Sequence, residues 1–158
     1  MQRTKGFSLI ELLIVVAIIL IIGAIALPSL LRARIAAAES SAVESVRTLN
    51  TAQIAYNSTY PTVGYAATLT DLGGVNCTPP NSNSACLIDN TLAGGQKTGY
   101  TFKLINVTGT PNSAYNVIAT PKPLGYWGMR YFCSYEDAVV RYSMNPIATC
   151  DGTISVLQ

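Results

Sequence analysis

Three residues near the N-terminus, Gly6, Phe7 and Glu11, have types and spacing that suggest chemistry at a peptide bond. Cleavage between Gly6 and Phe7 would remove a basic leader and leave Glu11 as the fifth residue of an apolar helix. A carboxylate costs about 2.5–3.5 kcal/mol at the centre of a membrane helix and less towards the interface. Glu11 therefore needs a partner, and the new amino group on Phe7 is the one that we expect.

An apolar segment follows these residues. Leu12–Leu31 contains twenty residues without a charge, which suffices for a membrane-spanning helix. A secretory signal differs from it, because its apolar core is shorter and the small-residue cleavage site comes afterwards. Since Arg3 and Lys5 precede the segment, we expect a cytoplasmic leader and a C-terminal part that faces outward.

The stretch GFSLIELLIVVAII, from Gly6 to Ile19, resembles the class III signal of type IV prepilins and type II secretion pseudopilins. The resemblance is close from Lys5 to about Pro28. It implies cleavage between Gly6 and Phe7 by a prepilin peptidase, followed by N-methylation of Phe7. An ordinary N-terminal membrane anchor would explain neither the Gly6–Phe7 pair nor the position of Glu11.

Composition fits an anchored, exported domain better than an enzyme or a nucleic-acid binder. Of ten basic residues, eight remain without Arg3 and Lys5, which matches the eight acidic residues. This balance argues against electrostatic DNA binding and suits subunits that pack side by side. The sequence has no histidine and no P-loop, dinucleotide or serine-elbow motif, so we expect neither enzymatic activity nor a cofactor.

Helical signals run from Ser8 to about Asn57, interrupted by Gly23 and Pro28. Pro28 predicts a kink or local melting around Ala24–Pro28. Beyond it, an amphipathic stripe with one polar interruption recurs at spacings of three and four. The stripe comprises Ile35, Ala38, Ala42, Val46, Leu49, Gln53, Tyr56 and Tyr60, and off it, facing solvent or a neighbouring subunit, lie Glu39, Glu44 and Arg47.

The remainder predicts an antiparallel sheet. Loop signals fill residues 62–96, and alternating runs over 100–104 and 115–119 predict a hairpin turning at Gly109–Asn112. Further strands are expected over 129–134 and 138–144, with a last short one over 153–157. A long helix followed by an antiparallel sheet is an α+β arrangement, the ladle shape that the pilin resemblance implies.

We therefore expect four parts along the chain. Residues 1–6 form the prepilin leader, 7–31 the transmembrane and assembly helix, 32–60 its amphipathic continuation, and 61–158 a globular antiparallel sheet domain.

The four cysteines, Cys77, Cys86, Cys133 and Cys150, all lie in the outward part, where an even count favours disulfides. Three connectivities exist. We favour Cys77–Cys86 and Cys133–Cys150, because each pair closes a short loop with turn-forming residues. The resemblance adds weight, since many type IV pilins close a C-terminal loop with a disulfide.

Metal binding has little support in the sequence. Asp137, Asn145 and Asp151 are weak calcium candidates, because oxygen ligands on a loop can gather around this ion. Major pseudopilins carry a calcium loop near the C-terminus, but this chain lacks their clustered acids. Adjacent acids such as Glu136 and Asp137 fit a solvated turn at a hairpin tip.

Three functions remain open. The first is a structural subunit of a type IV pilus, in which Glu11 pairs with the methylated Phe7 amine of a neighbour and the helices bundle into a homo-oligomeric filament. The second is a major-type pseudopilin of a type II secretion system. The third is a membrane-tethered monomeric binding module. The first two imply a bacterial inner-membrane precursor, a prepilin peptidase and assembly machinery, and then an extracellular pilus or a periplasmic pseudopilus.

Overall fold

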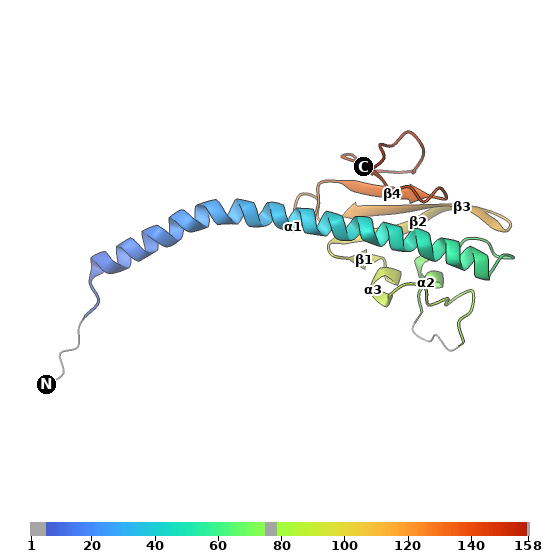
Figure 1. Cartoon of the computed structure of the whole chain (residues 1–158), viewed down its shortest axis with the longest axis horizontal. Coiled ribbons are helices and arrows are strands. Elements are labelled where there is room, and N and C mark those ends of the chain that lie inside the picture. Colours follow the sequence, from blue (N-terminus) through green and yellow to red (C-terminus); the bar gives the residue numbers. More distant parts are fainter. Residues whose placement is uncertain (1–5, 75–78, 158) are drawn as a thin grey trace. The chain divides into compact units, whose positions relative to one another are not determined.

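The computed structural model describes residues 6–74 and 79–157. The chain forms two compact units, Met1–Arg34 and Ile35–Gln158. The first is helical from Leu9 onward. The second, which we call the globular unit, combines the later part of the long helix α1 (Leu9–Thr59) with a five-stranded sheet (Figure 1). The α+β prediction is confirmed.

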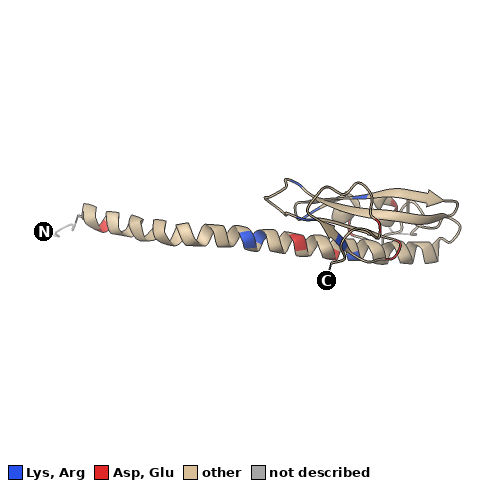
Figure 2. Cartoon of the chain, turned by 90° about the horizontal axis from the view of Figure 1, so that it is seen from above, with Lys and Arg blue, Asp and Glu red and all other residues tan. Residues whose placement is uncertain are grey.

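The first half of α1 is apolar and exposed. Between Phe7 and Leu31, its large apolar side chains have exposed fractions from 44% to 79%. By length and composition alone, α1 qualifies as a helix able to cross a membrane. Figure 2 shows that this half carries charge only near its start and then none until the arginines after Leu31.

The second half of α1 packs against the sheet along the predicted stripe. Ala38, Ala42, Val46 and Leu49 are buried, and Tyr56 continues the row. Gln53, the polar interruption, is fully buried. Its amide donates to the Ala66 carbonyl at 3.1 Å and accepts from the Ala66 N–H at 2.8 Å. The polar residue is therefore accommodated because it pairs with a backbone segment that would otherwise be unsatisfied.

The sheet is antiparallel throughout, in the order β1-β2-β3-β4-β5. Its central hairpin joins β2 (Tyr100–Gly109) to β3 (Asn112–Pro121), as predicted from the alternation and the turn. The other strands are β1 (Gln96–Lys97), β4 (Tyr131–Tyr135) and β5 (Arg141–Ser143). The strands expected over 129–134 and 138–144 therefore exist, with shifted or shorter bounds.

Two expectations for irregular regions were wrong. The region predicted as loop contains α2 (Leu69–Leu72) and α3 (Asn90–Ala93), each one turn long. Thr68 and Asp71 form a capping box that stabilises α2. The last strand expected over 153–157 is reduced to a single bridge between Val156 and Arg141.

Apolar clusters cover both faces of the sheet. Between α1 and the sheet lie the largest buried side chains, including Tyr100, Phe102, Tyr115 and Phe132. A smaller cluster on Ile118 includes Cys133 and Cys150. Because Ile118 alternates with Val117 and Ala119 along β3, the two clusters lie on opposite faces. The C-terminal segment therefore covers the face that α1 leaves open.

Candidate functional site

The predicted cleavage position is open in the structure. Phe7 is 77% exposed, and a Cβ built on Gly6 would have no atom within 4 Å. Packing of the described residues thus does not require a glycine at this position. A requirement for glycine must therefore come from another protein, such as a peptidase that recognises this residue. The leader residues before Gly6 lie outside the described residues.

Glu11 is held at the start of α1 by the backbone. Its Oε2 accepts a hydrogen bond from the Ser8 N–H at 2.9 Å, while the Leu12 N–H donates to the Ser8 carbonyl. Ser8 and Glu11 occupy the two ends of an S-x-x-E pattern, and the bond to the Ser8 N–H is the reciprocal half of a capping box. The expectation that the Phe7 amine is the one nearby partner of the Glu11 carboxylate was therefore incomplete. The capping pattern was visible in the sequence.

A broad apolar surface surrounds this carboxylate. Leu9 is 79% exposed and Ile10 63%, and the surface continues with Leu12 and Leu13. Soluble monomers rarely expose a contiguous apolar patch beyond a few hundred Å². The apolar surface of the first half of α1 thus fits surroundings of lipid or other apolar helices, in which Glu11 is the charge to be accommodated.

Gly23 and Pro28 do not interrupt α1. The helix is continuous through both, so the predicted local melting is wrong. Pro28 lacks the N–H that would bond to the Ala24 carbonyl, and the neighbouring turns maintain the helix without it. The kink at these residues stays a prediction.

One of the two predicted disulfides is present. Cys133 on β4 is joined to Cys150, 17 residues later, with their Cα atoms 5.8 Å apart. Both residues are buried, and the Cys150 carbonyl accepts from the Asn116 amide at 3.2 Å. Cys86 is not a free thiol. Cys77 lies outside the described residues, so the Cys77–Cys86 pairing stays a prediction.

The weak calcium candidates are engaged in other contacts. Asp137 forms an ion pair with Arg141, its Oδ2 lying 2.6 Å from a guanidinium nitrogen. Asp151 accepts from the N–H and hydroxyl of Thr153, and the Asn145 N–H donates to Ser143. In residues 6–74 and 79–157, no group of three or more His, Cys, Asp or Glu side chains could hold a metal ion. A guanidinium beside Asp137 would also repel a cation.

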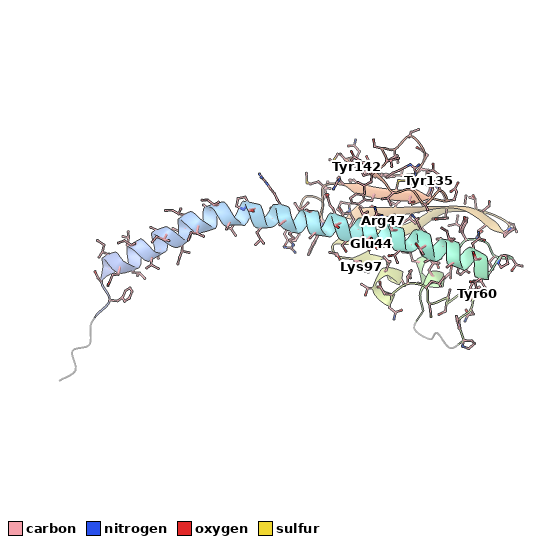
Figure 3. All side chains as sticks on the ribbon, in the orientation of Figure 1. Glu44, Arg47, Tyr60, Lys97, Tyr135 and Tyr142 are labelled. Atoms are coloured by element: carbon pink, nitrogen blue, oxygen red, sulfur yellow. A yellow bond between two sulfur atoms is a disulfide. The ribbon has the colours of Figure 1, made fainter. Side chains whose placement is uncertain are left out.

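The prediction that Glu39 faces solvent or a neighbouring subunit was wrong. Its side chain is 8% exposed and pairs with Arg130, whose Nη2 lies 2.7 Å from Oε2. Oε1 accepts from the N–H groups of Met129 and Arg130, at 2.8 and 3.2 Å. Because its partners lie 90 and 91 residues later, the helical pattern could not reveal this contact. Glu44 and Arg47, by contrast, are exposed as expected (Figure 3).

Comparisons with known proteins support the N-terminal interpretation. The family model described as the prokaryotic N-terminal methylation motif matches residues 1–27. No curated protein and no solved structure matches the chain significantly. With the exposed Gly6–Phe7 bond and Glu11 at the head of an apolar helix, residues 1–27 carry the class III prepilin signal of type IV pilins and pseudopilins.

Proposed function

We propose that this chain is a structural subunit of a type IV pilus. The observation that carries the proposal is the N-terminal methylation motif on a helix whose apolar surface is exposed from Phe7 to Leu31. Such a helix is stable in the inner membrane as a precursor. After extraction, a bundle of identical helices replaces the lipid around it.

Glu11 gives this bundle its register. Apolar helices in lipid have no hydrophobic reason to associate, so polar contacts direct their pairing. The Ser8 N–H satisfies part of the hydrogen-bonding capacity of the carboxylate but leaves its negative charge uncompensated. The methylated amine on Phe7 of a neighbouring subunit supplies the opposite charge. A contact between two different surfaces does not close on itself and yields an open helical polymer.

The globular unit favours the pilus over the alternative, a pseudopilin of type II secretion. The Cys133–Cys150 disulfide fixes the C-terminal segment covalently, whereas calcium would serve this purpose through free carboxylates. Asp137, the acid nearest to that role, is neutralised by Arg141. The third candidate, a tethered monomeric module, would use Glu11 only to cap its own helix through the Ser8 N–H and would have no use for its negative charge.

The test replaces Glu11 with glutamine. Glutamine retains an oxygen for the Ser8 N–H, because it serves at this position of a capping box, but it carries no charge. Charge-assisted hydrogen bonds are about twice as strong as neutral ones, so each docking contact should weaken by on the order of 1–2 kcal/mol. We expect normal cleavage and membrane retention with about a 5- to 30-fold loss of sheared extracellular filament.

Glu44→Gln is the matched control, because it removes a carboxylate from an exposed position on the same helix, where Glu44 lies 4.0 Å from Arg47. It should leave filament yield unchanged. Normal yield from Glu11→Gln would show that the charge does not direct assembly. Wild-type chain found only in the periplasm would favour the pseudopilin.

A further inference from the structure

The loop between β3 and β4, residues 122–130, exposes large apolar side chains. Leu124 is 55% exposed, Tyr126 46% and Met129 53%. Met144 is 63% exposed and lies at the same end of the sheet, because Ser143 pairs with Tyr131 at the start of β4. Four apolar side chains from two segments thus face outward at one end of the globular unit.

This loop has a fixed shape. The Gly125 N–H donates to the Gly128 carbonyl at 2.8 Å, and the rings of Tyr126 and Trp127 meet at 5.4 Å. Trp127 packs over Gly99, where any Cβ would overlap the indole ring. The apolar side chains therefore stay exposed because the backbone holds them there, and they cannot simply fold back onto the core.

The loop is anchored close to the end of the apolar segment. Met129 and Arg130 bind Glu39 on α1 through the backbone and the guanidinium. Glu39 follows Leu31 by eight residues, which is about 12 Å along an α-helix. The headgroup layer of one leaflet extends about 5–8 Å beyond the hydrocarbon core. Glu39 thus lies about 4–7 Å beyond that layer along α1, a gap that the loop bound to Glu39 is long enough to bridge when α1 spans the membrane. Figure 1 shows this loop beside the first turns that α1 contributes to the globular unit.

The charges on these segments fit the same surroundings. Lys122 begins the loop and no acidic residue lies between it and Arg130, whose own charge is balanced by Glu39. Arg32 and Arg34 directly follow the apolar segment. Aromatic residues concentrate at membrane–water interfaces, and basic side chains near the surface are attracted to anionic headgroups.

We propose that residues 122–130, with Met144, rest on the lipid headgroup layer while the subunit waits in the membrane. The inference builds on the proposed membrane-spanning state of α1. The contact would orient the globular unit before assembly and would be released when the subunit leaves the bilayer. A second copy of the chain is the competing occupant of this surface.

Trp127 is the single tryptophan of the chain, so the protein contains its own probe. The full chain is reconstituted in vesicles of zwitterionic and anionic phospholipid at a low ratio of protein to lipid. Flotation of the vesicles measures insertion of α1 independently. We expect brominated lipids with bromine near the headgroup to quench Trp127 more strongly than lipids with bromine deep in the chains.

Leu124→Ser combined with Met129→Ser should abolish this quenching while flotation persists. The matched control combines Ile54→Ser with Val63→Ser, which removes two exposed apolar side chains away from the loop and should leave the quenching intact. Unchanged quenching after tenfold dilution of protein in lipid supports lipid contact. Quenching that depends on protein density would instead assign the surface to a second copy and overturn the proposal.

Two further outcomes separate this inference from the proposed function. Flotation without shallow quenching would refute the lipid contact and leave the membrane-spanning helix intact. Absence of flotation would refute both.

Discussion

Glu39 and Arg130 connect α1 to the segment that precedes β4, and each of the two side chains also has further partners. The carboxylate accepts from two backbone N–H groups and from the guanidinium, which also lies over the rings of Phe132 and Tyr142 at 5.5 and 5.6 Å. A buried carboxylate is tolerated here because three N–H groups donate to it and the guanidinium of Arg130 compensates its charge.

Glu39→Ala should destabilise the globular unit by about 2–4 kcal/mol, because it leaves a guanidinium and two N–H groups without their acceptor. The measurement is urea unfolding of the full chain in detergent, followed by Trp127 fluorescence. Glu44→Ala is the control. Its pair with Arg47 is 72% and 63% exposed, so its removal should cost less than about 0.5 kcal/mol. Equal effects of the two changes would contradict the structural role of Glu39.

Asp137 predicts a loss of stability in acid. Partial burial alone would raise its pKa, but the hydrogen bonds from Arg141, Val139 and Tyr135 outweigh burial, and the pKa is lower than that of an ordinary carboxyl. A depressed folded pKa stabilises the protein above the unfolded value, about 3.9, and this contribution is lost as the pH falls through the folded value.

The thermal unfolding midpoint should therefore decrease when the pH drops below about 4. Asp137→Asn should make this dependence on pH shallower. Some dependence will remain, because hydrogen bonds from Leu92 and Thr153 lower the pKa values of Asp89 and Asp151 as well. Glu136→Gln removes the adjacent exposed acid and serves as the control. An identical pH profile for wild type and Asp137→Asn would show that the ion pair does not stabilise the fold.

At the scale of elements, local patterns predicted what depends on local contacts. The helical stripe identified Ala38 to Tyr56, and alternation identified the β2–β3 hairpin, because these periodicities reflect burial on one side of each element. Local patterns fail where the structure depends on contacts between residues far apart in the sequence. β5 is three residues long, and its neighbours are β4 and the C-terminal segment, neither of which the sequence between 138 and 144 could specify. In the candidate site, the N-terminal motif was recognised from the sequence. The hydrogen bond from the Ser8 N–H to Glu11 was not predicted, although the capping pattern that indicates it is visible in the sequence.

The Cys133–Cys150 disulfide ties the C-terminal segment to the sheet, and its loss should be costly. In the chain-entropy model, a bridge spanning 17 residues contributes about 3 kcal/mol. Cys150→Ser should lower the free energy of unfolding by roughly that amount. The apolar half of α1 belongs to the other compact unit, so membrane insertion should persist while filament yield falls.

Non-reducing peptide mapping of the wild type should also recover Cys77 linked to Cys86. Recovery of Cys77 linked to Cys133 would overturn the pairing.

At the scale of the whole molecule, we predict that maturation depends on Gly6. Since no atom lies within 4 Å of a Cβ at this position, Gly6→Val should leave the fold intact and act on processing alone. Unprocessed precursor should accumulate in the membrane, as immunoblots of fractionated cells would show. Mass spectrometry of wild-type assembled protein should find Phe7 as the first residue, carrying one methyl group. Assembled protein that begins at Met1 or Gln2 would contradict the prepilin interpretation.

The short outer strands of the sheet have a consequence for crowded subunits. β1 contains two residues, and the outer side of β5 is occupied by the bridge from Val156 and the bonds from Tyr142 to Ser155 and from Leu157 to Val140. β1 pairs only with Tyr100 and Thr101 of β2, and the rest of the outer edge of β2 is interrupted by Lys103 and by a bulge between Ile105 and Thr108. Long open borders invite strand addition and amyloid-like growth. In the proposed filament, crowded copies of this chain would therefore associate through their helices and not through sheet edges, and the fibre would keep one defined geometry.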